Sequence, residues 1–262
     1  MRTRATEIAN GREALHQQSK RPVMIVSFSG IDGAGKSTQI VELEAWLRQL
    51  GLRTQLLTFW DDVVILSKFR EFASHKAFRG DRGVGSPQNP LHRRDKNVTA
   101  WPVTLTRFGL YLADALHLRW KVREARRSDA DIVILDRYIY DELANLPLTR
   151  WSAIRFTRLI LKLAPKPDIA YLIDAAPVAA QARKPEYPLE FVRRNRDAYI
   201  TLAHLSGAMT VVRPDSIAAM KTRIQNEMLQ ALALKAVAGE ARHLSASAPN
   251  RANISPGELI EP

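Results

Sequence analysis

The sequence predicts an α/β fold in three layers, with a parallel β-sheet covered by helices on both faces. Short apolar runs alternate along the chain with longer amphipathic segments, which is typical of βαβ units. A Gly-rich motif stands at one junction between such a run and the segment after it. The 262 residues contain no cysteine and are 46% hydrophobic, which excludes a disulfide-stapled module and indicates a globular domain.

Five apolar runs are predicted to be the buried strands of this sheet. Each run is short and is bounded by polar or turn-forming residues. In chain order the predicted strands cover residues 23–29, 54–59, 131–135, 169–173 and 209–212.

The amphipathic segments between these runs are predicted to be the covering helices. Leu105, Phe108, Leu112 and Leu116 would fall on one face of a single helix, and Gly51 would end another. Because crossovers between parallel strands are right-handed, these helices cover both faces of the sheet. The predicted helices cover residues 37–50, 105–126, 152–163, 189–205 and 217–234.

The two ends of the chain and one internal segment lack this pattern. Residues 1–20 are polar and basic and predict a mobile N-terminal arm, although an Arg-rich start also resembles an organellar transit peptide. Residues 238–262 are poor in apolar groups and predict a disordered tail, which leaves residues 21–237 as the folded domain. The basic, Gly- and Pro-rich residues 74–100 predict a long loop, either a functional lid or a disordered excursion.

The charge balance favours anionic partners. Thirty-nine Lys and Arg against 27 Asp and Glu give a formal net charge of +12. Charge alone does not choose among nucleotides, nucleic acid and acidic lipid, but the basic run at residues 92–96 is short and interrupted by Asp95, which disfavours nucleic acid. No apolar stretch approaches the roughly 18 residues of a membrane span, so we expect a cytoplasmic protein without a membrane partner. Without cysteine, any metal should be bound by oxygen, as magnesium is.

A phosphate-binding loop is predicted at residues 30–37 (GIDGAGKS), which match G-x-x-x-x-G-K-[ST]. The motif follows a predicted strand and opens a predicted helix, whereas an accidental Gly-rich turn would need neither. Its backbone N–H groups would surround phosphate oxygens, Lys36 would reach the β- and γ-phosphates, and Ser37 would bind Mg²⁺. The expected nucleotide contacts are Gly30, Asp32, Gly33, Ala34, Gly35, Lys36, Ser37 and Thr38.

Acidic side chains flank this phosphate loop in two places. Asp32 lies within the loop, where a carboxylate should turn away from phosphate, either toward the hydroxyl of a second substrate or toward solvent. Asp136 and Arg137 follow a buried strand and should emerge at the ligand-binding edge of the sheet. Asp136 would hold Mg²⁺ through water and Arg137 would bind phosphate; a simple surface ion pair between the two is the alternative.

The ordered motifs VSFSGIDGAGKSTQ, VILDRY, PDIAYLIDAAPVAAQARK and EFVRRNRDAYITLA resemble those of the thymidylate kinase family of nucleoside monophosphate kinases. The resemblance covers most of residues 22–235. It implies a P-loop NTPase fold with five parallel strands in the order 2-3-1-4-5. It also implies Mg²⁺-dependent transfer of the ATP γ-phosphate to a nucleotide such as dTMP, and a homodimer. A kinase for another acceptor and a non-catalytic nucleotide binder remain alternatives.

The resemblance also implies roles for individual residues. Lys36 and Ser37 would serve the ATP phosphates and Mg²⁺, and Asp32 would contact the acceptor sugar. Asp136 and Arg137 would manage Mg²⁺ water and the acceptor phosphate. In a lid at residues 182–188, Arg183 would supply the cation that neutralises the transition state, and Lys184 is an equally reachable cation. The alternative is that this segment is a solvated basic turn without a catalytic role.

The chain departs from the family pattern where the acceptor would be recognised. Phe59-Trp60-Asp61-Asp62 replaces an Arg-Glu-Pro-Gly cluster, and Trp60 is a candidate for stacking on the acceptor base. Ala115 stands where the family has an arginine near the base, and Asp141, Glu142 and Asn145 replace Ser, Asn and Tyr. A carboxylate in place of an amide would favour a base face rich in hydrogen-bond donors. Arg196 is expected on a solvated helix face with Glu190 and Asp197.

Overall fold

The computed structural model describes residues 22–65 and 101–247, with side chains described for residues 22–65 and 105–238. The predicted arm at residues 1–20 and the basic segment 74–100 lie outside the described residues. The chain divides into two compact units, Met1–Ile224 and Gln225–Pro262, and the sheet with its surroundings belongs to the first.

A five-stranded parallel sheet forms the centre of the first unit, in the order β2-β3-β1-β4-β5. This confirms the predicted fold class and strand order. Phe28 of β1 and Thr58 of β2 both lie beside Asp136 of β3, so the carboxyl ends of these strands meet at one edge. The strands are β1 (Met24–Ser29), β2 (Thr54–Thr58), β3 (Ile132–Asp136), β4 (Ile169–Ile173) and β5 (Met209–Val212).

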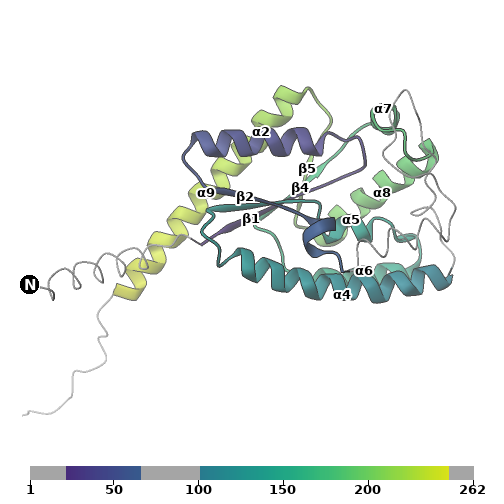
Figure 1. Cartoon of the computed structure of the whole chain (residues 1–262), viewed down its shortest axis with the longest axis horizontal. Helices are drawn as coiled ribbons and strands as arrows, with labels where there is room; N and C mark the ends of the chain where they lie inside the picture. The colour runs from purple at the N-terminus through teal and green to yellow at the C-terminus, as the bar shows by residue number, and fades with distance from the viewer. Residues whose placement is uncertain (1–21, 66–100, 248–262) are drawn as a thin grey trace, which may run out of the picture. The chain divides into compact units, whose positions relative to one another are not determined.

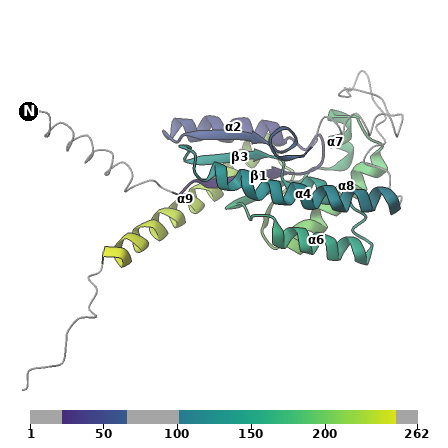
Figure 2. The same ribbon diagram turned by 60° about the horizontal axis from the view of Figure 1, so that its bottom comes forward.

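Helices cover both faces of the sheet, as predicted: α2 lies on one side and α4 and α6 lie on the other (Figures 1 and 2). The five long helices are α2 (Lys36–Gln49), α4 (Trp101–Ala125), α6 (Trp151–Leu163), α8 (Leu189–Ser206) and α9 (Ile217–Ser247). The last helix, α9, extends to Ser247, past residue 238, where the predicted tail begins. Within the part of the chain that the structure describes, no helix is long and apolar enough to cross a membrane.

Three short helical elements were not predicted: the π-helical turn η1 (Phe59–Val63), α5 (Ile139–Leu143) and α7 (Pro177–Arg183). The predicted strand 54–59 ends at Thr58 because the Asp62 carboxylate accepts a 2.6 Å hydrogen bond from the Thr58 N–H and starts the turn. Proline in the first turn favours α7, whose last turn takes up the start of the predicted lid at residues 182–188.

The inner face of α4 differs from the predicted one. Tyr111, Ala115 and Leu118 are buried, whereas Leu105 and Leu116 are 61% and 53% exposed. This helix is apolar on more than one side, so its sequence fits two helical faces and we assigned the wrong one. The exposed side chains leave an apolar surface on α4.

The core lies between these layers and holds in place the edge of the sheet where the carboxyl ends of the strands meet. Every residue of β1 is buried, and the rings of Phe28 and Tyr171 pack with their centroids 5.1 Å apart. The Tyr171 hydroxyl donates a 3.1 Å hydrogen bond to the carbonyl of Ile224, which holds the first turns of α9 against β4. A rigid β1 therefore carries the Gly-rich loop that follows it.

Candidate active site

The Gly-rich loop after β1 is pressed against two other elements. Gly30 and Gly33 have φ values of +144° and +80°, which L side chains rarely adopt. A Cβ atom on Gly30 would lie 2.4 Å from the carbonyl oxygen of Ile173 at the end of β4. A Cβ atom on Gly33 would lie 2.2 Å from the carbonyl oxygen of Ala180 in α7. Glycine is therefore required at both positions, and the loop is clamped between β4 and α7.

Lys36 begins α2 and folds its side chain back into this loop. Its ammonium donates hydrogen bonds of 2.7 Å to the carbonyl of Gly30 and 3.0 Å to the carbonyl of Ile31. The side chain is buried, and burial together with the positive charge of Arg137 lowers the pKa of Lys36 to about 8. Ser37 and Thr38, by contrast, are exposed at the start of α2. The Lys36 ammonium thus lies within the loop and the Ser37 and Thr38 hydroxyls are exposed beside it, an arrangement suited to binding phosphate.

Arg137 stands directly after β3 in an unusual backbone conformation. It has a φ of +73°, and its N–H donates a 2.9 Å hydrogen bond to the carbonyl of Phe28. Its guanidinium forms an ion pair with Asp32 of the phosphate loop and donates a 3.1 Å hydrogen bond to Asp141 of α5. Asp32 thus points to an arginine, not to solvent. Arg137 pairs with these two carboxylates, and not with Asp136 as in the alternative of a simple surface ion pair. Left-handed non-glycine residues are concentrated at functional sites.

Asp141 connects four parts of this site. Its carboxylate accepts hydrogen bonds from the Ser29 hydroxyl (2.6 Å), the Tyr138 N–H (3.1 Å) and the Tyr199 hydroxyl (2.8 Å), besides the bond from Arg137. Tyr199 lies on α8 and Ser29 ends β1, so the carboxylate joins β1, α5 and α8. We predicted that Asp141 faces the acceptor base, but its carboxylate is 3% exposed and engaged inside the protein.

Two of the other positions predicted to face the acceptor are also enclosed. Glu142 and Ala115 are fully buried in α5 and α4. The Asn145 side chain donates a 2.9 Å hydrogen bond to the carbonyl of Asp141. Trp60 is partly exposed and packs edge-on against Phe59, with 6.0 Å between ring centroids. Of the residues that we assigned to acceptor recognition, Trp60 is the one with an accessible ring.

The charges at the sheet edge act on one another. Burial raises the pKa of Asp136, although the positive charges of Arg137 and Lys36 oppose the shift. Burial by itself lowers the pKa of Arg137, but the carboxylates of Asp32 and Asp141 outweigh it and raise that pKa. Arg137 therefore stays charged, and the Lys184 ammonium is also close enough to act on Asp136. The structure brings Lys36, Asp136, Arg137 and this lid lysine together.

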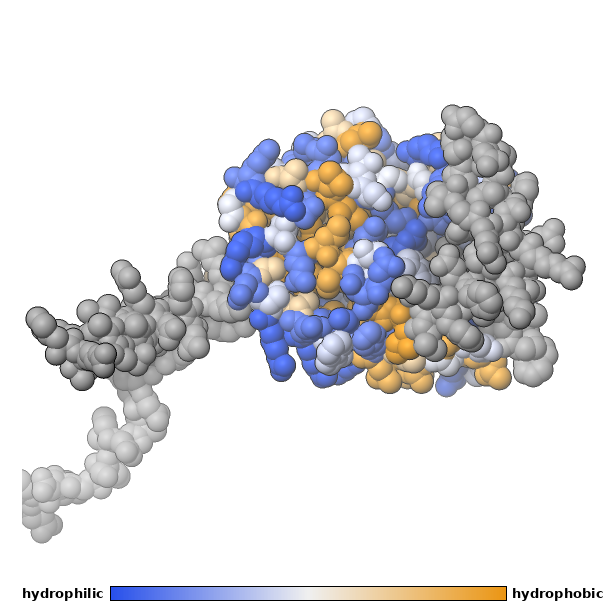
Figure 3. All heavy atoms as spheres, viewed as in Figure 1, coloured by the Kyte–Doolittle hydropathy of each residue, from blue (hydrophilic) through white to orange (hydrophobic). Residues whose placement is uncertain are grey.

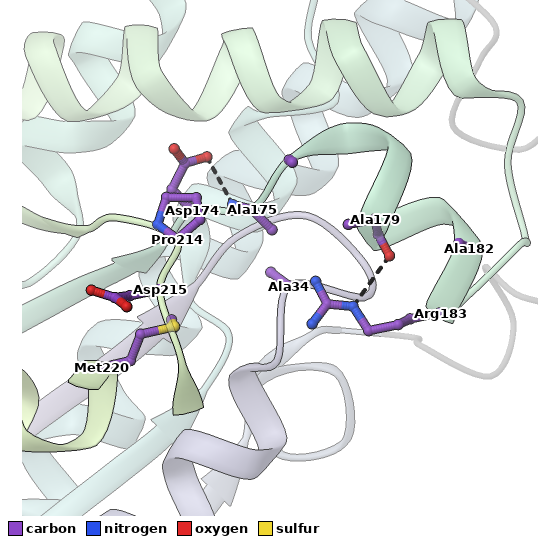
Figure 4. Close-up of a pocket in the computed structure, with 10 residues that line it drawn as sticks. Ala34, Asp174, Ala175, Ala179, Ala182, Arg183, Pro214, Asp215 and Met220 are labelled. Atoms are coloured by element: carbon purple, nitrogen blue, oxygen red, sulfur yellow. Dashed lines mark hydrogen bonds between the residues drawn. The ribbon is translucent and has the colours of Figure 1, made fainter. Parts of the chain in front are cut away.

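A cleft of about 520 Å³ opens on the other side of the phosphate loop (Figure 4). Small side chains line its wall, and Arg183 extends from the end of α7 toward Ala34 of the loop. The Arg183 guanidinium donates a 3.2 Å hydrogen bond to the carbonyl of Ala179. A flat apolar group could lie against the alanines with its phosphates toward the loop. The lining residues are Ala34, Asp174, Ala175, Ala176, Ala179, Ala182, Arg183, Pro214, Asp215 and Met220.

One ion pair at this cleft was missed by the sequence reasoning. Arg196 of α8 donates two 2.7 Å hydrogen bonds, one to each carboxylate oxygen of Asp174, which is 7% exposed. We expected Arg196 on a solvated face with Glu190 and Asp197, and that prediction was wrong. Asp174 directly follows the apolar strand β4, much as Asp136 ends β3, and this position in the sequence could have identified it as a residue of the site. The pair fixes α8 to the edge of β4.

The residues present fit a magnesium ion held partly by nucleotide phosphates. Among residues 22–65 and 105–238, no three Asp, Glu or His side chains gather into a metal cluster. Mg²⁺ in nucleotide sites instead takes one or two protein oxygens along with water and phosphate oxygens. The exposed Ser37 hydroxyl at the loop and the carboxylate of Asp136 beside Lys36 supply oxygens of that kind.

Comparisons with curated proteins find relatives across most of the chain, although no family model matches it. A "probable thymidylate kinase" from Pyrobaculum aerophilum is 29% identical over 207 residues, covering 74% of this chain and 92% of that protein. The thymidylate kinase of Chlorobium luteolum is 27% identical over 180 residues, covering 66% and 74%. That of Bifidobacterium longum subsp. infantis is 28% identical over 192 residues, covering 69% and 74%.

Solved structures with the same fold are also found. The crystal structure of thymidylate kinase from Ehrlichia chaffeensis matches with a TM-score of 0.52 and 19% identity, over 79% of this chain and 99% of that chain. Thymidylate kinase from Candida albicans matches with a TM-score of 0.54 and 15% identity, over 81% and 93%. At these identities the structural matches support the fold, and the sequence relatives support the family.

Proposed function

The chain is related in sequence and in fold to the thymidylate kinase family of nucleoside monophosphate kinases, and we propose that it is an ATP- and Mg²⁺-dependent phosphotransferase of this type. The acceptor is a nucleoside monophosphate, either dTMP or a related nucleotide. We also propose that the protein is cytoplasmic and that nucleic acid is not its substrate.

One observation carries this proposal: Lys36 and Arg137, 101 positions apart in the sequence, meet at one edge of the sheet. The charge of Arg137 acts on Lys36 and contributes to its lowered pKa. Two cations so close repel each other, and the carboxylates of Asp32 and Asp141 offset part of this repulsion. A donor phosphate at Lys36 and an acceptor phosphate at Arg137 would add negative charge where the two cations meet.

The side chains of the site have separable tasks. Lys36 would draw the β- and γ-phosphates into the loop and neutralise the charge that develops on the transferred group. Arg137, fixed by Asp32 and Asp141, would keep its remaining N–H groups for the acceptor phosphate. Ser37 and Asp136 would hold Mg²⁺, which, when bound, shields the phosphate charges from one another. Arg183 would contact the donor base in the cleft beside the loop, and Lys184 would add positive charge near Asp136 at the site of transfer.

A second candidate, a P-loop kinase whose acceptor is a nucleoside or another small molecule, is favoured by the burial of the predicted recognition positions. Ala115 and Glu142 are fully buried, and the Asp141 carboxylate is engaged by four donors. A thymine ring would have to be recognised by other side chains, among them Trp60. This leaves the base of the acceptor open to experiment.

A phosphotransfer assay with Mg²⁺-ATP and a panel of nucleoside monophosphates and nucleosides tests both candidates. We expect turnover of one monophosphate, and a loss of at least about 100-fold in the Lys36→Ala variant. Turnover of a nucleoside instead would support the second candidate. Binding of an ATP analogue without turnover of any acceptor would contradict both and identify a non-catalytic nucleotide binder.

We also propose that the chain forms a homodimer through the face made by α4 and α6. This face exposes Leu105, Leu116 and Trp120 on α4 and Trp151 and Leu159 on α6. Apolar atoms gather along the border of the molecule where α4 runs (Figure 3). Exposed apolar groups gathered on one face favour association. Sedimentation should give a dimer for the wild type and a monomer for Leu116→Glu, and a monomeric wild type would contradict the proposal.

A further inference from the structure

A second cleft, which we call the basic cleft, is lined in part by residues that directly follow Arg137 in the sequence. It has a volume of about 520 Å³ and shares no lining residue with the cleft of Figure 4. Tyr138 and Tyr140 form part of its wall, and residues 164–166, between α6 and β4, form another part. The Tyr138 hydroxyl donates a hydrogen bond of 2.5 Å to the Pro165 carbonyl and closes the floor. Its size is within the range of pockets that hold small molecules.

Three cations border this cleft without acidic partners. Arg158, Lys162 and Lys166 line it, all three are exposed, and none of its lining residues is an Asp or Glu. Within residues 22–65 and 105–238, none of the three forms an ion pair. Arg158 and Lys162 lie four residues apart in α6, a spacing at which like charges repel. Residues 146–167 contain no acid at all, so the sequence does not balance this charge locally.

A tyrosine hydroxyl adds a hydrogen-bond donor to the basic cleft. Tyr140 lines the basic cleft and is 3% exposed, yet its hydroxyl has no hydrogen-bond partner among the described residues. Burial raises the pKa of Tyr140 to about 12, so at neutral pH this hydroxyl is a donor. A ligand oxygen in the basic cleft would satisfy the Tyr140 hydroxyl.

We propose that the basic cleft binds a small organic phosphate, a monoester whose body is apolar or aromatic. The phosphate would accept hydrogen bonds from Tyr140 and ion pairs from Arg158 and Lys162, and arginine suits phosphate because its guanidinium binds two oxygens at once. The body would lie against Tyr138 and the apolar residues Leu161 and Leu205. The site is separate from the phosphate loop and does not depend on the function proposed above.

Calorimetric titration of the full chain with phenyl phosphate tests the proposal. The titration is carried out in Lys36→Ala, which weakens the phosphate loop and leaves the basic cleft intact. Added to this background, the double change Arg158→Ala and Lys162→Ala should raise the dissociation constant at least roughly tenfold. Tyr140→Phe, which keeps the ring, should raise it several-fold. The double change Arg193→Ala and Arg194→Ala removes an equal charge from the exposed face of α8 and should change it less than about twofold.

Four results would overturn the proposal. The first is no saturable binding in Lys36→Ala, since the phosphate loop would then be the sole site. The second is an equal effect of the double change Arg193→Ala and Arg194→Ala, which indicates general charge attraction. The third is benzoate binding as tightly as phenyl phosphate, which would make the ligand a carboxylate. The fourth is displacement of phenyl phosphate by a short single-stranded oligonucleotide whose binding needs Lys162, which would make the surface a nucleic-acid contact.

Discussion

Arg137 and Asp141, four residues apart, form a 3.1 Å ion pair that spans the turn between β3 and α5. The pair holds the guanidinium in place, because Arg137 has a left-handed backbone that by itself is unfavourable for an L residue. The same carboxylate is bound by Ser29 and Tyr199, so the position of Arg137 depends on residues of three other elements. The orientation of Arg137 is therefore built into the folded core.

Replacing Asp141 by asparagine should weaken both the fold and the acceptor site. An amide has one oxygen to accept hydrogen bonds, whereas the carboxylate now accepts four from Ser29, Arg137, Tyr138 and Tyr199. Because the site is buried, the donors left without partners should lower the free energy of unfolding by about 1–3 kcal/mol. Denaturant unfolding measures this, and the KM for the acceptor should rise while binding of an ATP analogue stays intact.

Tyr199→Phe is the matched control for this change. It removes one of the four donors and leaves the Asp141 charge beside Arg137, so it should cost no more than about 1 kcal/mol and leave the acceptor KM nearly unchanged. If both variants change the acceptor KM equally, Asp141 acts on the core alone and does not position Arg137.

The sequence predicted the parts of the site that are local in the chain. The phosphate loop, its flanking strand and helix, and the polar ends of apolar strands are encoded within a few residues, and all five strands were predicted. The partners of Arg137 and Asp141 were not predicted, because Arg137 and Asp32 are 105 positions apart, and Ser29 and Asp141 are 112 apart. A residue that looks like a substrate contact in the sequence can become a core partner once the chain folds. The apolar face of α4 was misassigned for a different reason, since that helix carries apolar residues on two faces.

Binding of ATP should be linked to proton uptake by Lys36. Burial and the charge of Arg137 lower its pKa to about 8, and a phosphate beside the ammonium would raise it again. Near pH 8.5 the free protein therefore holds this lysine largely neutral, and the complex holds it charged. Calorimetry with an ATP analogue in buffers of different ionisation enthalpy should show uptake approaching one proton per site, and none in Lys36→Ala.

The same shift makes stability depend on pH. Between about pH 8 and the ordinary lysine value of 10.5, the unfolded chain binds a proton that the folded chain does not. The contribution of Lys36 to stability therefore rises with pH, by up to about 1.4 kcal/mol per unit. The difference in unfolding free energy between wild type and Lys36→Met should grow in favour of the wild type from pH 8 to pH 10. A difference that stays constant over this range would mean that Lys36 titrates normally in the folded protein.

Gly33→Ala should destabilise the phosphate loop by more than the strain of placing alanine at a positive φ. A Cβ atom there would lie 2.2 Å from the Ala180 carbonyl oxygen, so α7 or the loop must move. Gly51→Ala is the control, because its φ of +76° is close to the +80° of Gly33 and nothing lies within 4 Å of its Cβ. Both variants should lose about 1–2 kcal/mol to strain. Only Gly33→Ala should lose further stability and weaken titration by an ATP analogue.

The two lid cations should affect different steps of the reaction. Arg183 lines the cleft beside Ala34 and lies on the side proposed for the donor base, whereas the charge of Lys184 acts on Asp136 at the site of transfer. Lys184 also forms a 3.4 Å ion pair with the buried Glu186, which holds it near that position. Arg183→Ala should therefore raise the KM for ATP several-fold with a small change in kcat. Lys184→Ala should lower kcat by roughly 10- to 100-fold, because it removes a positive charge that stabilises the transition state.

Steady-state kinetics of the Arg183→Ala and Lys184→Ala variants, with both substrates varied, separates the two effects. The reverse pattern would make Arg183 the catalytic lid residue, as the family resemblance implies, and equal small effects would mean that this lid is a solvated turn.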